Sequence, residues 1–317
     1  MTTKTQRLIW RDYNKSLCNR CNLFVWVCED FLKALNDPAP EGPRKRGRPV
    51  LYKDSLIELV LSIRYVLGFP LRQVTGLCQS LFPRMGIPID LPDYTTLCRR
   101  GKKLSLQIGL KHKGKPVHLA LDSTGLKVYG EGEWKVRQHG VGKRRTWLKV
   151  HFAVDIETFD IHCVGVTTND ISDGEVVPDL LKNTPNLGKT YGDGAYDTQG
   201  SRKAIKAKGG VPIIPPREDA VLHPEKEALF ERNKALEDIE RYKKEGLSIE
   251  EARRRWKKES GYHQRSKVET HMYRFKTIFG DACRSRHFDN QANEIFLKTK
   301  LLNKVTARGM PKYLKVA

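Results

Sequence analysis

The sequence predicts a mixed α/β fold that is preceded by a mainly helical, basic region. Two observations support this expectation. From residue 116 onward, short apolar segments with strand-like alternation are interspersed with segments of helical periodicity. Between residues 54 and 106, apolar residues recur at helical spacing instead, and no strand-like pattern interrupts them.

The part of the chain after residue 116 contains the expected elements of a sheet. Residues 117–122 form an apolar strand that ends on Asp122, and residues 147–156 and 160–167 form a hairpin with a three-residue turn. The further elements expected before residue 217 are a helix over 172–181, a short strand ending at Asp193, a helix over 198–208 and a strand over 211–214.

Two helical regions complete this part of the chain. Residues 217–260 carry balanced charges and helix formers throughout, which predicts a charged helical insertion or hairpin. A final helix is expected from Gly261-Tyr262 to about Phe279, with Gly280 as its stop. We therefore expect two domains, residues 1–115 and 116–317.

Residues 1–115 predict a DNA-binding region. A proline-rich, charged linker over 36–49 precedes a helix capped by Asp54, a second helix over about 71–82 and a third capped by Asp93. Residues 54–106 thus suit a module similar to a helix-turn-helix, although the connection over 83–92 is long. The alternative is a helical bundle with a charged solvent face.

The composition indicates a nucleic-acid partner. The chain has 317 residues, a formal net charge of +21 and a pI of about 9.7. So large a positive charge is typical of proteins that bind a polyanion, and DNA or RNA is the common one. No apolar run is long enough to span a membrane and no signal peptide is visible, so we expect a cytoplasmic, nucleoid-associated protein. Seven scattered cysteines suggest reduced thiols, and Cys18-x-x-Cys21 with Cys28 lacks a matching second ligand pair for zinc.

Basic residues gather at two places before residue 116. Arg46 and Arg48 belong to a stretch that either lies in a DNA minor groove or is a solvated linker. The candidate recognition residues on the third helix are Arg99, Arg100, Lys102 and Lys103.

Acidic residues follow two of the expected strands. Asp122 and Asp193 both come directly after apolar segments, where an unpaired carboxylate is costly to bury. Two such acids in one sheet suggest a shared site for a hard cation such as Mg²⁺, although aspartates also occur in caps and turns. Asp197 competes for the role of second acid, but its position suits a helix cap better.

The last expected helix carries a polar face. Tyr262, Arg265, Glu269 and Lys276 fall at offsets that share one side of a helix, which is unlike a core stripe. Glu259 precedes Gly261, so we expect it outside the helix. Trp256, just upstream, either stacks on an unpaired base or packs the insertion onto the sheet domain.

These residues and motifs resemble the DDE transposases of bacterial insertion sequences, of the family-five type. The matching segments are LDSTGLKVYGEGEW (121–134), YGDGAYDT (191–198), the Tyr-x2-Arg-x3-Glu-x6-Lys spacing of 262–276, and, near the N-terminus, WRDYN (10–14), GRP (47–49), LRQVTGLCQSLF (71–82) and LPDYTTLCRR (91–100). The resemblance spans almost the whole chain, and the 262–276 spacing is its most specific part.

The resemblance implies a ribonuclease-H-like catalytic domain with the triad Asp122, Asp193 and Glu269. By analogy, Asp122 would bridge two Mg²⁺ ions, for which Mn²⁺ could substitute, and the other two acids would each complete one. Further positions implied in DNA binding are Tyr262, Arg265 and Lys276. The implied partners are the element ends, target DNA and further copies of the chain, as a homodimer or higher oligomer on DNA.

Two other functions remain open on the sequence. A ribonuclease-H-like nuclease would cut DNA without joining strands, and it would not need an end-recognition region such as residues 54–106. A catalytically silent repressor would bind DNA only, and the intact acids argue against it.

Overall fold

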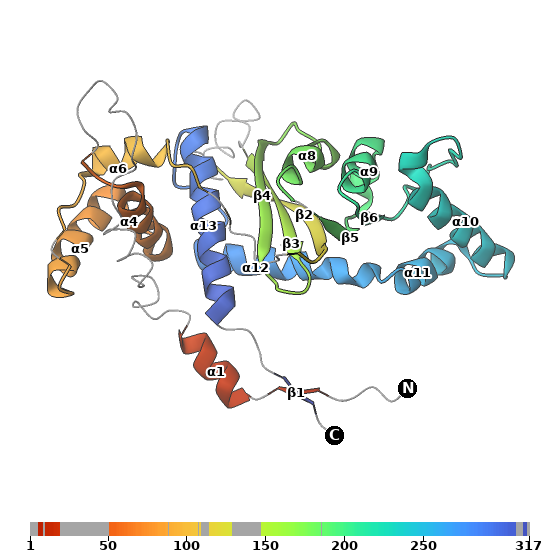
Figure 1. The fold of residues 1–317 in the computed structure, drawn as a ribbon, viewed down its shortest axis with the longest axis horizontal. Helices are drawn as coiled ribbons and strands as arrows, with labels where there is room; N and C mark the ends of the chain where they lie inside the picture. Colours follow the sequence, from red (N-terminus) through yellow and green to blue (C-terminus); the bar gives the residue numbers. More distant parts are fainter. Residues whose placement is uncertain are drawn as a thin grey trace, which may run out of the picture. The chain divides into compact units, whose positions relative to one another are not determined.

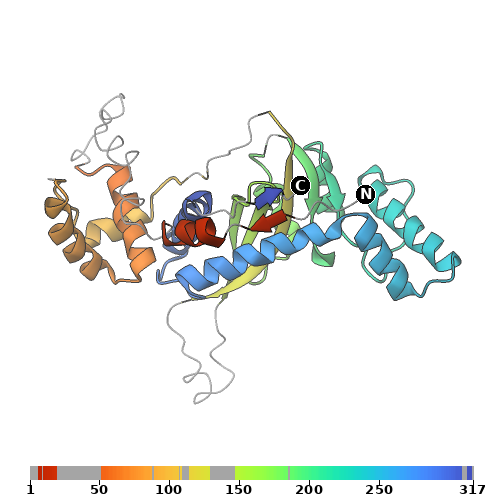
Figure 2. The same cartoon turned by 90° about the horizontal axis from the view of Figure 1, so that it is seen from below.

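The computed structural model describes residues 6–8, 10–19, 51–87, 89–106, 108, 114–128, 147–184, 186–308 and 313–315. It divides into two compact units, one made of Met1–Gln107 with Ser285–Ala317 and the other of Ile108–Arg284. Figure 1 and Figure 2 show the elements of each unit. No helix among the described residues is long and apolar enough to cross a membrane.

The second unit is built on a five-stranded mixed sheet in the order β4-β3-β2-β5-β6, which confirms the predicted α/β class. Its strands are β2 (Val117–Lys127), β3 (Trp147–Asp155), β4 (Ile161–Thr168), β5 (Leu187–Tyr191) and β6 (Val211–Ile213). The pairs β2–β3 and β3–β4 are antiparallel, whereas β5 is parallel to both β2 and β6. The predicted hairpin is therefore confirmed, and its turn includes Phe159 with a left-handed φ of 59°.

One strand is longer than the sequence predicts. The expectation that the first strand ends on Asp122 is wrong, because β2 continues to Lys127 and pairs with β3 along this whole extension, from Asp122↔Phe152 to Lys127↔Trp147. The apolar run stops at Leu121, yet the backbone groups beyond it are still satisfied by the neighbouring strand. Asp122 therefore lies inside a strand, where its direction is set by the sheet.

Helices cover both faces of this sheet. Helices α8 (Asp173–Leu180) and α9 (Gln199–Lys206) contribute to a core with Val117, Leu119 and Leu121 of β2. On the other face, Phe275 of α12 (Ser266–Phe279) packs on Phe152 of β3, with ring centroids 5.4 Å apart. Because side chains alternate along a strand and paired residues share a face, Asp122 lies on the same face as Phe152.

The charged segment after β6 forms the predicted helical hairpin. A 3₁₀ turn, η2 (Glu227–Leu229), leads into α10 (Phe230–Lys244), and α11 (Ile249–Glu259) begins with a capping box between Ser248 and Glu251. The helices share a small core made of Ala235, Ile239, Tyr242, Ala252 and Trp256. This core explains how a segment so rich in charge folds back on itself.

The segment that begins at Tyr262 is not one regular helix. A 3₁₀ turn, η3 (Tyr262–Arg265), follows Gly261, whose φ is 75°, and α12 starts only at Ser266. Gly280 ends α12, as predicted. The expectation that this is the last helix is wrong, since α13 (Phe288–Arg308) follows.

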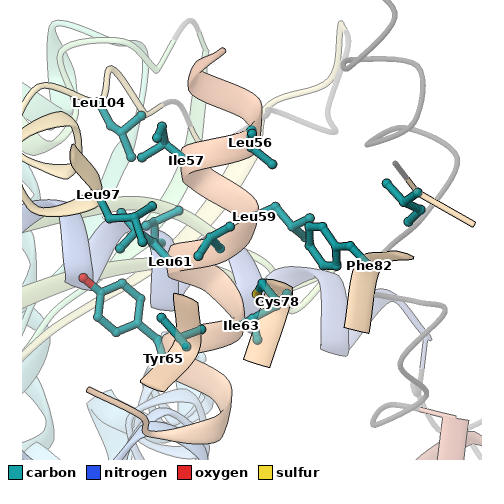
Figure 3. Packing of buried hydrophobic residues seen from close by; sticks show 14 residues of the cluster. Leu56, Ile57, Leu59, Leu61, Ile63, Tyr65, Cys78, Phe82, Leu97 and Leu104 are labelled. Carbon is teal, nitrogen blue, oxygen red and sulfur yellow. The ribbon is translucent and has the colours of Figure 1, made fainter. Parts of the chain in front are cut away.

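The first unit gathers helices from both ends of the chain. Helices α4 (Asp54–Leu67), α5 (Leu71–Arg84) and α6 (Tyr94–Gly101) confirm the three predicted helices, and Figure 3 shows their shared core. Leu297 of α13 belongs to the same core. Residues 285–317 therefore group with the N-terminal helices. The division expected from the sequence, into residues 1–115 and 116–317, had placed them with the sheet.

The described part of this unit also contains α1 (Trp10–Asn19) and a two-stranded sheet of β1 (Gln6–Leu8) and β7 (Tyr313–Lys315). Asp93 caps α6 as predicted, by accepting hydrogen bonds from the backbone of Thr95 and Thr96. The expectation that Asp54 caps α4 is wrong, because Asp54 is the first residue of the helix and Lys53 occupies the N-cap position without a side-chain cap hydrogen bond. The predicted linker over 36–49, including Arg46 and Arg48, lies outside the described residues, as do Cys21 and Cys28.

Candidate active site

The sheet places two aspartates side by side. In the parallel pair of β2 and β5, Ala120 is opposite Tyr191. Asp122 and Asp193 each lie two residues beyond these partners, so the register brings them to the same level on neighbouring segments of the chain. Asp193 stands just after β5, where its Oδ1 accepts a hydrogen bond from the backbone N–H of Ala195 at 2.9 Å.

The third acid comes from α12 and is joined to the first through an arginine. Arg265 Nη1 lies 2.9 Å from Asp122 Oδ2, and Arg265 Nη2 is paired with Glu269. The Arg265 and Asp122 side chains are largely buried, whereas 54% of the Glu269 side chain is exposed. The structure therefore brings together acids from β2, the end of β5 and α12.

The acids influence one another electrostatically. Burial raises the pKa of Asp122, and the nearby Asp193 and Glu269 raise it further, while the Ser123 backbone N–H and Arg265 lower it. The net direction is upward. A raised carboxyl pKa in a half-buried acidic cluster is typical of a site that gains from binding a cation.

Of the two other residues on the predicted polar face, one joins this cluster and one lies apart from it. Tyr262 of η3 is beside Arg265, whose guanidinium carbon is 6.0 Å from its ring centroid, and burial raises the pKa of its phenol. Lys276 lies in the last turn of α12, roughly 10 Å along the helix axis from Glu269. The nearby Asp281 is paired mainly with Lys127, at 2.8 Å.

Asp197 is placed very differently from Asp193. Its side chain is 1% exposed and forms an ion pair with Arg202, which is 0% exposed, at 2.9 Å. Its other oxygen accepts the backbone N–H of Arg217 at 3.0 Å. A carboxylate with both oxygens occupied inside the protein is a structural group, which favours Asp193 as the second acid.

Trp256 lies inside the helical hairpin, with only 8% of its surface exposed. Its ring centroid is 6.4 Å from that of Tyr262. In this arrangement the indole is part of the hairpin core, so the packing alternative accounts for it better than base stacking does.

The basic residues of the predicted recognition helix lie in the other unit. Arg100 pairs with Asp54 at 2.5 Å and Lys102 with Asp289 at 3.2 Å, so part of their charge supports the helical packing. Arg99 and Lys103 are exposed, and the Arg99 side chain donates hydrogen bonds to Thr95 of its own helix. Arg99 and Lys103 are thus the ones best placed to meet a ligand.

The chemistry of the three acids fits a hard divalent cation. Carboxylate oxygens from three separate elements are the donors that Mg²⁺ and Mn²⁺ prefer, and one arginine offsets only part of their charge. Within the described ranges, no three acidic, histidine or cysteine side chains converge closely enough to hold an ion as they stand. In this arrangement Arg265 forms ion pairs with two of the three acids, Asp122 and Glu269.

Sequence reasoning missed Arg202 and Arg217. Arg202 occupies an ordinary helical position and Arg217 follows the pair Pro215-Pro216, and neither position carries a local signal of its contacts. Arg217 nevertheless reaches the loop of Asp193, because its Nε donates to the backbone oxygen of Gly194 at 3.2 Å. The place of Arg217 beside this loop depends on a contact between segments that are distant in the sequence, so the sequence alone does not reveal it.

Comparisons with known proteins identify the family of the chain. Residues 113–304 and residues 18–131 each match a family model described as a transposase DDE domain. An uncharacterized protein of Aquifex aeolicus (strain VF5) is 28% identical over 188 residues, which cover 55% of this chain. The chain spans about half the length of that relative, 51%. Since the first of these family models covers more than half of the chain, including Asp122, Asp193 and Glu269, the protein belongs to the DDE transposases.

Proposed function

We propose that this transposase binds the terminal repeats of an insertion sequence, cleaves DNA at the element ends and joins the 3′ ends to target DNA. The single observation that carries the proposal is that Asp122, Asp193 and Glu269 stand on adjacent elements of the sheet unit, with Arg265 paired to both Asp122 and Glu269. Within a transposase fold, such a set of acids suits metal-assisted phosphoryl transfer.

The three acids would hold two Mg²⁺ ions, or Mn²⁺ in their place. When bound, such ions activate an attacking hydroxyl and stabilise the leaving oxygen of an in-line displacement. Asp122 is held in direction by β2 and Asp193 by its own cap on Ala195, so both carboxylates are preorganised. Glu269 is on α12 and more exposed, which leaves it free to adjust.

The residues around the acids would orient the DNA. Arg265 offers a forked donor that suits a phosphate once it is released from Asp122 and Glu269, and Tyr262 beside it offers a phenol. Lys276 would contact the backbone further along α12. We assign end recognition to α6, with Arg99 and Lys103 as its exposed basic residues.

The proposed partners follow from this reaction. Element ends and target DNA must be held together for strand joining, so we propose a homodimer or higher oligomer on DNA, acting in the cytoplasm at the nucleoid. The basic net charge of +21 suits association with a long polyanion.

A strand-transfer assay tests the proposal. A labelled duplex with a pre-cut element end is incubated with supercoiled plasmid and Mg²⁺, and joined products are resolved on a gel. We expect joining with the unmodified protein and none with Asp193→Asn, in which the amide oxygen still caps Ala195. Asp179→Asn, an exposed aspartate of α8, is the matched control and should join normally.

Two outcomes would contradict the proposal. Cleavage without any joined product would make the protein a nuclease. DNA binding without cleavage, in the presence of either metal, would make it a silent DNA-binding protein.

A further inference from the structure

The segment that follows β6 passes beside the second acid of the site. Arg217 Nε donates to the backbone oxygen of Gly194, the residue after Asp193, at 3.2 Å. The Arg217 side chain is exposed, and within the described part of the chain neither of its terminal nitrogens takes part in a hydrogen bond or ion pair. It therefore presents two terminal nitrogens and a positive charge at the loop that carries Asp193.

The backbone of Arg217 is firmly held. Its N–H donates to Asp197 Oδ2 at 3.0 Å, and the buried ion pair with Arg202 fixes that carboxylate in turn. Arg202 Nη2 also donates to the Ile214 oxygen at 3.0 Å, so the start of the segment is anchored to α9. A side chain on such a rigid base is preorganised for a ligand.

The helical hairpin holds the same residue from the other side. Arg253 of α11 donates to the backbone oxygens of Pro216 at 3.2 Å and Arg217 at 3.3 Å. These contacts satisfy the carbonyl groups of the segment, while the Arg217 side chain reaches the loop of Asp193 through its Nε contact to Gly194. The segment is thus clamped between α9, the Asp193 loop and α11.

The electrostatics of the site call for such a cation. DNA that approaches three carboxylates brings further negative charge, and a guanidinium held at the loop that carries one of them lowers that repulsion. Arg265 is engaged with Asp122 and Glu269, whereas Arg217 has no acidic partner among the described residues. A guanidinium with two free terminal nitrogens matches the geometry of a phosphate group.

We propose that Arg217 is a further DNA-binding residue, which takes a backbone phosphate next to the scissile bond and holds the strand against Asp193. This inference rests on the proposed function, because it assigns a phosphate contact within the same site. It adds the charged hairpin to that site, since Arg253 helps to hold the residue that contacts DNA.

Equilibrium binding to an end duplex tests the contact without requiring cleavage. For Arg217→Ala, we expect binding about 10-fold weaker at moderate salt, and a log–log salt dependence shallower by about 0.9, because the protein then neutralises one phosphate fewer. Arg217→Lys keeps the positive charge but loses the two terminal nitrogens of the guanidinium, so its affinity should lie between those of the unmodified protein and Arg217→Ala. Arg254→Ala is the matched control, because Arg254 is an exposed arginine of α11, 79% accessible, that faces Glu250.

Neutral methylphosphonates, placed singly around the cut site, locate the phosphate. One position should weaken binding by the unmodified protein and have no effect on Arg217→Ala. Cleavage by Arg217→Ala should show a raised KM with a smaller change in kcat.

An unchanged affinity and salt slope in Arg217→Ala would overturn the inference, as would a fall in kcat alone, which would mean that Arg217 only supports the Asp193 loop. Both results can occur while the unmodified protein cleaves and joins DNA, so they leave the proposed function intact. Failure of the unmodified protein to join ends would instead refute the proposed function.

Discussion

Replacing Asp197 by Asn should destabilise the second unit strongly while the same change at Asp193 should not. Asp197 is 1% exposed and its partner Arg202 is 0% exposed, with the charged atoms 2.9 Å apart. Asn keeps the shape and still accepts the Arg217 N–H, but it removes the charge that compensates a buried guanidinium. Among the described residues, the hydrogen bond of the Asp193 side chain is a local cap on Ala195, which an amide oxygen preserves.

The magnitude follows from the burial of the pair. Leaving one member of a buried ion pair without its partner costs about 3–5 kcal/mol, because the desolvated charge is no longer offset. For a unit of this size, each kcal/mol shifts the unfolding temperature by about 2–4 °C, so the expected loss is about 6–20 °C. Arg202→Met should produce a loss of similar size by exposing the carboxylate to the same penalty.

Scanning calorimetry of the full chain measures this effect, with DNA cleavage recorded on the same preparations below the transition. Asp197→Asn should unfold early, whereas Asp193→Asn should unfold as the unmodified protein does and be inactive. The double change Asp197→Asn with Arg202→Met should recover part of the loss. A stable, inactive Asp197→Asn together with an active Asp193→Asn would refute both the structural role of Asp197 and the choice of the second acid.

Four further outcomes are expected. Glu269→Gln should abolish cleavage and keep the affinity for DNA within about 2-fold of that of the unmodified protein, whereas Glu259→Gln should remain active. If both variants cleave DNA in a nicking assay, Glu269 does not belong to the triad. Arg99→Ala should weaken end-specific binding in a competition assay by about 1–3 kcal/mol. An equal loss of binding to unrelated DNA would mean that Arg99 contacts only phosphates. Arg100→Ala should weaken end-specific binding as well and also lower the thermal stability, because it removes the ion pair with Asp54. Chelation should stop cleavage and added Mg²⁺ or Mn²⁺ restore it, and activity that survives thorough chelation would contradict a metal-assisted reaction. Burial lowers the pKa of His151, so on acidification the unfolded chain takes up the His151 proton before the folded chain does. The contribution of His151 to the free energy of unfolding should therefore be complete above about pH 6.5 and decline below it. Denaturation series near pH 8 and pH 5 should show a smaller decline for His151→Gln than for the unmodified protein.

Local periodicity was enough to predict most of the elements. The hairpin of β3 and β4 and the three helices of residues 54–106 follow from apolar spacing and caps, and the helical insertion follows from its helix-forming, charged composition. These signals all lie in near neighbours along the chain. The same reasoning singled out Asp122 and Asp193, because each follows an apolar segment, and placed Glu269 on a polar helix face; the resemblance to DDE transposases then joined the three as a triad. The family models confirm the DDE transposase to which these residues pointed.

Contacts between distant segments decided the rest. The extension of β2 beyond Asp122 depends on its pairing with β3, and the grouping of α13 with the N-terminal helices depends on a shared core. Neither leaves a local mark, since a backbone partner or an apolar contact can come from anywhere in the chain. The same is true of the charges: the sequence contains Asp197 and Arg217 as ordinary polar residues, and only folding buries the first beside Arg202 and brings the second to Gly194.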